Sequence, residues 1–155
     1  MNKSQLKDIL LQSIDEAIEA AIEAARTAQE SAAHENNQPE NQYDTLSLEA
    51  AYLAHGQSER ILSLQEERIT VARWKPLEYT EDDEIGTGAV VGLTNETGEM
   101  QWFWLALTGG WQVRVLDRNI RVISSDAPLA RQMGGLGIDD HVLLAGQSWA
   151  VAQIG

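Results

Sequence analysis

The sequence predicts an α+β fold in which a long helical hairpin precedes a small antiparallel β-sheet that carries one short helix. Two observations lead to this prediction. Up to about residue 73, apolar residues recur at three- and four-residue steps, as in amphipathic helices. After about residue 87, short segments rich in Val, Ile and Trp alternate with glycine turns, as in strands. We therefore expect two domains, residues 1–75 and residues 76–155.

The composition narrows the class of protein. The chain has 155 residues, a net charge of −13 and no cysteine, which excludes disulfides and thiolate metal sites. Its acidic field repels phosphate backbones, so direct binding of nucleic acid is not expected. No apolar run approaches the roughly 20 residues of a transmembrane helix, and the amphipathic start is unlike a secretory signal. We expect a cytoplasmic protein whose partner is a basic protein surface or a metal ion.

One helix is predicted from Ser4, a plausible N-cap, to about Ala33. Beside a line made of Ile14, Ile18 and Ile22, its other small and apolar residues form an adjacent line: Leu6, Ile9, Leu10, Ser13, Ala17, Ala21, Ala25 and Ala28. Alanine on this line allows close approach of a second helix. At 1.5 Å per residue, about 30 residues extend roughly 45 Å.

A second helix is predicted from about Thr45 to Arg73, after the polar segment HENNQPENQYD at residues 34–44. Either Thr45 or Asp44 is suited to cap it. One face carries Leu48, Tyr52, His55, Leu62 and Ile69, with Glu59 as an interruption. We expect this face to pack against the first helix, so that the pair forms an antiparallel coiled-coil hairpin.

The second half contains several strand-like segments: TGAVVGLTN, EMQWFWLAL, WQVRVLD, RVIS, DHVLLAG and SWAVAQIG. The segment SDAPLARQMGG interrupts them and predicts a short helix. Ser125 or Asp126 is its expected N-cap, Pro128 lies near its start, and Gly134 is its expected stop.

Aromatic and basic side chains are interleaved in the predicted sheet. Trp102 and Trp104 share one strand face and Phe103 takes the other. One face must be core, and an exposed one would suit docking because aromatics dominate interface hot spots. The arginines of the next two strands either pair with acids on the sheet or meet an acidic partner surface: Arg114, Arg118 and Arg121.

Two motifs extend this picture. The ending ISSDAPLARQMGGLGIDDHVLLAGQSWAVAQI contains Ser125, Pro128, Leu129, Ala130, Arg131, Gly137, Asp139 and Asp140. The hairpin segment LEAAYLAHGQSERI contains Ala50, Tyr52, Ala54, Arg60 and Ile61. In this order and spacing the two motifs resemble those of the bacterial Gre transcript-cleavage and elongation factors, over nearly the whole chain.

The resemblance implies a function in transcription. It implies an FKBP-like C-terminal domain that docks on RNA polymerase at the rim of the secondary channel. The hairpin would enter that channel, and the protein would modulate elongation with no active site of its own. The resemblance assigns polymerase contacts to the C-terminal signature, for which the candidates are Pro128, Arg131, Asp139 and Asp140.

The hairpin tip departs from the family pattern. In cleavage-competent members, two tip carboxylates help the polymerase to hold a second catalytic Mg²⁺, for which oxygen ligands are suited. Alignment on Tyr52 puts Thr45 and Leu48 at those positions, and neither is a carboxylate. The candidate tip acids are Asp44, Glu40 and Glu49. Asp44 is either a helix cap or a ligand of an Mg²⁺ shared with the polymerase; no intrinsic cofactor is expected.

Three other functions stay open at this point. A channel-binding regulator without cleavage activity fits the altered tip, although the Rnk type has a shorter hairpin. A peptidyl-prolyl isomerase would share the FKBP-like fold but needs an apolar, aromatic-lined pocket. A coiled-coil adapter would present an exposed apolar stripe along the hairpin, whereas a polar hairpin with an acidic tip favours the channel.

Overall fold

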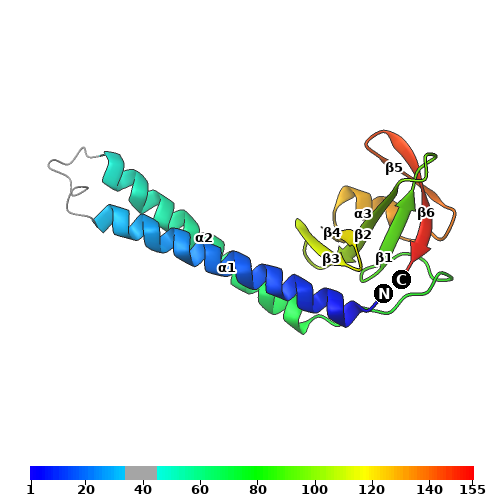
Figure 1. Ribbon diagram of the computed structural model, residues 1–155, viewed down its shortest axis with the longest axis horizontal. Coiled ribbons are helices and arrows are strands. Elements are labelled where there is room, and N and C mark those ends of the chain that lie inside the picture. The colour runs from blue at the N-terminus through cyan, green and yellow to red at the C-terminus, as the bar shows by residue number, and fades with distance from the viewer. Residues whose placement is uncertain (34–44) are drawn as a thin grey trace. The chain divides into compact units, whose positions relative to one another are not determined.

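The computed structural model describes residues 1–33 and 45–155, and its elements are labelled in Figure 1. Two long helices, α1 (Lys3–Ala33) and α2 (Thr45–Arg73), precede a six-stranded sheet with one short helix, α3 (Pro128–Met133). The predicted α+β class is therefore confirmed. The chain divides into two compact units, Gln12–Ile69 and Met1–Leu11 with Thr70–Gly155. The domain boundary predicted between residues 75 and 76 stays a prediction.

Within the unit Gln12–Ile69, α1 and α2 run antiparallel. Arg68, near the end of α2, pairs with Asp15, near the start of α1, and a second contact joins Arg68 Nη2 to Asp15 Oδ2 at 3.2 Å. Leu53, near the start of α2, lines a shallow hollow with later residues of α1. The alanine face predicted for α1 is confirmed by its buried members, Ala21, Ala25 and Ala28.

The face of α2 that was predicted to pack against α1 is exposed, so that prediction is wrong. The exposed fractions are 52% for Leu48, 67% for Tyr52, 62% for Leu62 and 51% for Ile69. His55, expected in the same seam, is also exposed and lies 3.3 Å (Nε2 to Oε1) from Glu59.

A second line of residues on α2 takes the buried side. Ala54 and Leu64 are 7% and 2% exposed. Arg68 follows Leu64 by four residues and therefore lies on the same line of the helix. The Arg68–Asp15 ion pair therefore favours the orientation of α2 in which this line faces α1. The small side chain of Ala54 suits packing against the alanine face of α1.

The sheet has the strand order β3-β4-β2-β1-β6-β5. Its strands are β1 (Val90–Thr94), β2 (Met100–Ala106), β3 (Trp111–Val115), β4 (Arg118–Ser124), β5 (His141–Leu144) and β6 (Gln147–Ile154). Every strand falls within a predicted segment or overlaps it. The purely antiparallel sheet was wrong, because β2 and β4 pair in parallel while the other pairings are antiparallel. The reason is that β3 goes to the sheet edge, and β4 returns between β3 and β2.

The two faces of the sheet carry different cores. Phe103 of β2 belongs to the cluster that includes Ala130 and Met133 of α3. Trp104, its neighbour in sequence, is buried on the opposite face, where it stacks on Trp74 with ring centroids 5.4 Å apart. The alternation predicted for this strand is therefore confirmed.

The first turn of α1 is tied through a buried lysine to the segment that precedes β1. Lys3 Nζ donates hydrogen bonds to the carbonyl oxygens of Gly88 (2.6 Å) and Leu77 (3.0 Å), and burial lowers the pKa of Lys3. Ser4 was predicted as the N-cap, but the helix already includes Lys3. Asn2 Oδ1 instead accepts a hydrogen bond from the Gln5 amide at 3.1 Å, which is the bond a capping side chain makes.

Neither of the long helices, nor any other helix in residues 1–33 and 45–155, has the unbroken apolar length that a bilayer crossing needs.

Candidate functional site

The short helix of the C-terminal signature presents two of the predicted contact residues. Ala130 and Met133 turn into the core, which leaves Pro128 and Arg131 exposed. Pro128 is the first helical residue, where its missing N–H costs nothing. The expected caps Ser125 and Asp126 were wrong, because Ala127 is the N-cap and makes no side-chain capping bond. The expected stop is confirmed, since Gly134 is the C-cap.

Ser125 has a structural contact instead of a capping contact. Its hydroxyl donates to the Ala106 carbonyl oxygen at 3.1 Å and accepts from Thr87 Oγ1 at 2.9 Å. Ala106 ends β2, so Ser125 ties the entry of α3 to the end of that strand. This part of the signature therefore supports the fold.

The two acids of the signature lie in the turn before β5 and have different surroundings. Asp140 Oδ2 accepts the Gly137 amide at 2.8 Å, so this carboxylate closes the turn. Asp139 adopts a positive φ of 69°, and its amide donates to the Val151 carbonyl oxygen at 2.9 Å. The Asp139 side chain is exposed. The four predicted polymerase contacts are thus exposed residues within 128–140, a segment whose Ala130 and Met133 are buried, and their role stays a prediction.

Of the three candidate tip acids, the structure describes only Glu49. Glu40 and Asp44 lie outside the described residues. Glu49 lies near the start of α2 and is exposed. Across residues 1–33 and 45–155, no three acidic or histidine side chains gather as metal ligands would. The shared Mg²⁺ site at the tip therefore stays a prediction.

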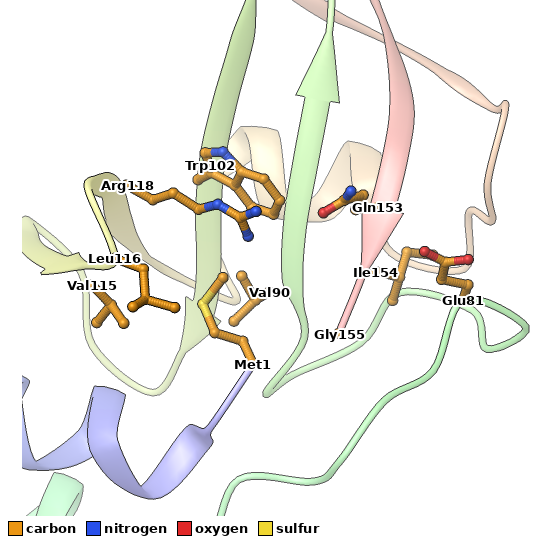
Figure 2. Close-up of a pocket in the computed structure, with 10 residues that line it drawn as sticks. All are labelled: Met1, Glu81, Val90, Trp102, Val115, Leu116, Arg118, Gln153, Ile154 and Gly155. Atoms are coloured by element: carbon orange, nitrogen blue, oxygen red, sulfur yellow. The ribbon is translucent and has the colours of Figure 1, made fainter.

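A groove of about 190 Å³ that the sequence did not predict lies on the sheet beside Trp102 (Figure 2). Trp102, Leu116 and Arg118 line one part of it, and Val90, Gln153 and Glu81 line another. We call it the Trp102 groove. The Arg118 guanidinium carbon lies 4.4 Å from the centroid of the Trp102 ring, a cation–π contact.

Gly92 holds the Trp102 ring against the sheet. A Cβ atom at position 92 would lie 3.0 Å from Cη2 and Cζ3 of Trp102, closer than packed carbons normally approach. Trp102 pairs directly across from Gly92 in the β1–β2 register. The absence of a side chain at Gly92 leaves room for the edge of the Trp102 ring beside β1.

The turn between β3 and β4 forms the lip of the groove. Val115 and Arg118 are paired, so Leu116 and Asp117 make a two-residue hairpin turn, and both have positive φ (48° and 61°). This is the backbone of a type I′ turn, which favours Asn and Gly. Leucine is a costly choice there, and Leu116 is 86% exposed.

Of the three sheet arginines, Arg114 pairs with an acid and the other two pair with none among the residues that the structure describes. Arg114 pairs with Asp117, with Nη2 and Oδ1 3.4 Å apart. Arg121 Nη2 donates to Gln101 Oε1 at 2.9 Å. In the described part of the chain no carboxylate lies within ion-pair distance of Arg118. Of these three arginines only Arg118 lines the groove, and its position in the chain gave no local signal for the groove.

Comparison with solved structures finds Gre-related proteins. The GreA factor homolog 1 (Gfh1) of Thermus thermophilus is 19% identical, with a TM-score of 0.39 over 94% of both chains. Another structure of the transcription factor Gfh1 is 19% identical, with a TM-score of 0.39 over 93% of this chain and 92% of the other. Thermus aquaticus Gfh1 is 20% identical, with a TM-score of 0.37 over 92% of each chain. No protein-family model and no curated protein matches the chain.

Proposed function

We propose that this chain is a Gre-like transcription factor that binds RNA polymerase and places its helical hairpin in the secondary channel to modulate elongation. The proposal rests on the two sequence motifs and on the elements that carry them. The hairpin motif lies on α2, and the C-terminal signature runs through α3 to the closing strands β5 and β6. This is the order that the resemblance implies.

The main support for the proposal is that some residues of the C-terminal signature stabilise the fold while others are exposed and make no polar side-chain contact with the rest of the described chain. Ser125 and Asp140 make hydrogen bonds that support the fold. Pro128, Arg131 and Asp139 are exposed, and within the described residues the side chains of Arg131 and Asp139 make no hydrogen bond or ion pair. Exposed charges that the fold does not need are available to a partner, and arginine is enriched at interface hot spots.

The finer proposal concerns cleavage of backtracked RNA. The chain would have no active site of its own and would act in the cytoplasm. At most, Asp44 with Glu40 or Glu49 would add carboxylate oxygens to an Mg²⁺ that the polymerase mainly holds. This Mg²⁺ would activate the water that attacks the phosphodiester. Asp44→Ala should then abolish stimulated cleavage in stalled complexes without weakening polymerase binding. If the unaltered chain never stimulates cleavage, the channel-binding regulator without cleavage activity replaces this version.

The exposed face of α2 favours a second candidate, a coiled-coil adapter. Leu48, Tyr52, Leu62 and Ile69 recur with heptad spacing when His55 and Glu59 are included, and more than half of each apolar residue is exposed. Such a stripe can receive another helix. A second copy of this chain presents the same stripe, so the adapter predicts self-association that Leu62→Glu abolishes, measured by light scattering at about 100 µM.

One binding experiment separates the two candidates. The full chain, carrying an affinity tag, is mixed with purified core RNA polymerase and captured, with and without an excess of an authentic Gre factor. The proposed function predicts capture of the polymerase and its loss on competition. Absence of capture would overturn the proposal and leave the adapter. A proline-peptide assay tests the isomerase separately; the Trp102 groove, at about 190 Å³, lies below the roughly 300–1,000 Å³ usual for small-molecule sites.

A further inference from the structure

We propose that the Trp102 groove binds an acidic peptide segment of another protein, with a carboxylate on Arg118 and an adjacent apolar side chain against Trp102 and Leu116. This inference does not depend on polymerase binding.

Arg118 is set up for an external carboxylate. Its guanidinium lies over the Trp102 ring, which orients the planar donor group, and among the described residues no carboxylate is close enough to pair with it. Arg114, two positions before the turn, does have an acidic neighbour, Asp117. A guanidinium held on an indole keeps its N–H groups available at the ring edge, where a carboxylate can accept two of them.

The charge of the surroundings makes this position unusual. Residues 76–155 contain four arginines, namely Arg114, Arg118, Arg121 and Arg131, against eleven acids. Three of the four lie on β3 and β4. Strand alternation places Arg114 and Arg121 on the face of the sheet opposite to Arg118. Among the residues that line the groove, Arg118 is therefore the one arginine or lysine, and it is the group that would meet a ligand carboxylate, whereas Glu81 lies at the other end of the groove.

Leu116 would contact the apolar side chain of the peptide. It combines 86% exposure with a positive φ of 48°, so neither burial nor backbone preference explains a leucine at this turn. Strained, exposed positions are concentrated at binding sites. Leu116, Met1 and Val90 line the part of the groove next to the Trp102 ring (Figure 2), and together they offer apolar surface to a side chain of the ligand.

The size and the far wall of the groove point to a peptide. A volume of about 190 Å³ suits one or two side chains, whereas drug-sized ligands need roughly 300–1,000 Å³. Gln153 and Glu81 line the wall away from Arg118 and offer acceptors for backbone N–H groups. An extended segment presents these three kinds of group together, namely a carboxylate, an apolar side chain and amide donors.

The test uses the full chain and two capped peptides, acetyl-Leu-Asp-Glu-Leu-amide and its uncharged counterpart acetyl-Leu-Asn-Gln-Leu-amide. The indole N–H resonance of Trp102, assigned by its loss in Trp102→Phe, reports binding in ¹⁵N-labelled protein. We expect the acidic peptide to shift this resonance saturably and to bind about ten-fold more tightly than the uncharged peptide, as for one charge-assisted contact. Equal shifts from both peptides, or no shift from either, would overturn the proposal.

Three variants locate the effect. Arg118→Gln should weaken binding of the acidic peptide about ten-fold, and Arg118→Lys should weaken it by a smaller factor because lysine keeps the charge but not the planar fork. Arg114→Gln is the matched control and should leave affinity within about two-fold. An equal loss in Arg114→Gln and Arg118→Gln would show general attraction by charge and overturn the site. Leu116→Asn keeps the turn and should lose affinity while the amide spectrum elsewhere is unchanged; full retention of affinity would remove Leu116 from the site.

Discussion

Leu116 occupies the left-handed backbone region, where the Cβ of an ordinary residue crowds the following carbonyl oxygen. Two more residues depart from what their type usually does. Lys3 is a lysine with only 2% exposure, held by two carbonyl oxygens. Asp83 closes a turn by accepting both the amide (2.7 Å) and the hydroxyl (2.9 Å) of Thr80, which lowers its pKa. Each departure gives a prediction.

Leu116→Asn should raise stability by about 0.5–1 kcal/mol, because asparagine tolerates the left-handed conformation and suits a type I′ turn. Thermal unfolding of the two proteins measures the difference. A residue that served only the fold would lose stability when replaced. A lower melting temperature for Leu116→Asn would therefore contradict the view that Leu116 is retained for binding.

Lys3→Met should cost about 1–3 kcal/mol, because the carbonyl oxygens of Gly88 and Leu77 lose a buried donor. Its pH dependence has a definite sign. Burial lowers the Lys3 pKa from 10.5, so the unfolded chain binds more protons in the window between the lowered pKa and 10.5. Stability contributed by Lys3 therefore rises with pH across that window, and Lys3→Met should lack this rise.

Denaturant unfolding of both proteins from neutral pH to pH 10.5 measures this difference. Lys7→Met is the matched control, because Lys7 also donates to two carbonyl oxygens but is only half-buried. The control should cost less than Lys3→Met. A stability difference between Lys3→Met and the unaltered chain that stays constant with pH would argue against the buried, pKa-lowered lysine.

Asp83→Asn tests a group with the opposite linkage. The folded pKa of Asp83 lies below 3.8 because its charged form accepts the Thr80 hydrogen bonds. Its contribution is therefore fully present above the unfolded pKa and is lost as the pH falls through the lowered folded value. The gap in melting temperature between Asp83→Asn and the unaltered chain should be constant above about pH 5 and close toward pH 2. A gap that persists at pH 2 would disprove this assignment.

The buried face of α2 could not be predicted from the pattern of its apolar residues. Two lines of residues along α2 have heptad spacing. The line with the larger apolar residues, which includes Leu62, was predicted to be buried, but the line with Leu64 is buried instead. Which line is buried depends on its partner, since the alanines of α1 favour small Ala54 and Asp15 fixes Arg68. Neither contact has a local signal. The strands, the short helix and its Gly134 stop were predictable because alternation, Pro128 and the glycines are local.

A pair of leucines two positions apart on α2 tests this orientation. Leu64→Ala should cost about 2–5 kcal/mol, since Leu64 is 2% exposed and its loss leaves a cavity. Leu62→Ala should stay within about 0.5 kcal/mol, since Leu62 is 62% exposed. Unfolding followed by the helical circular dichroism signal gives both values. Equal costs, or a larger cost at Leu62, would restore the orientation that the sequence predicted.

The order of the helices and strands along the chain and the positions of both motifs could be predicted from the sequence. The parallel β2–β4 pair could not, because it depends on β3 taking the sheet edge instead of pairing with β2. The Trp102 groove could not either, since it joins residues from β1, β2, the β3–β4 turn and β6. Its components are ordinary in sequence and become a site only where the strands meet.

An affinity measurement can test the proposed binding of RNA polymerase through the C-terminal signature. Because the chain has no cysteine, Glu96→Cys in an exposed turn accepts a single dye, and anisotropy then reports binding of core polymerase. We predict saturable binding that an authentic Gre factor displaces. Arg131→Ala should weaken it about five-fold or more, as for an interface hot spot, and Arg114→Gln should change it less than two-fold. Absence of binding at micromolar polymerase, or binding that neither the competitor nor Arg131→Ala affects, would rule out this interaction.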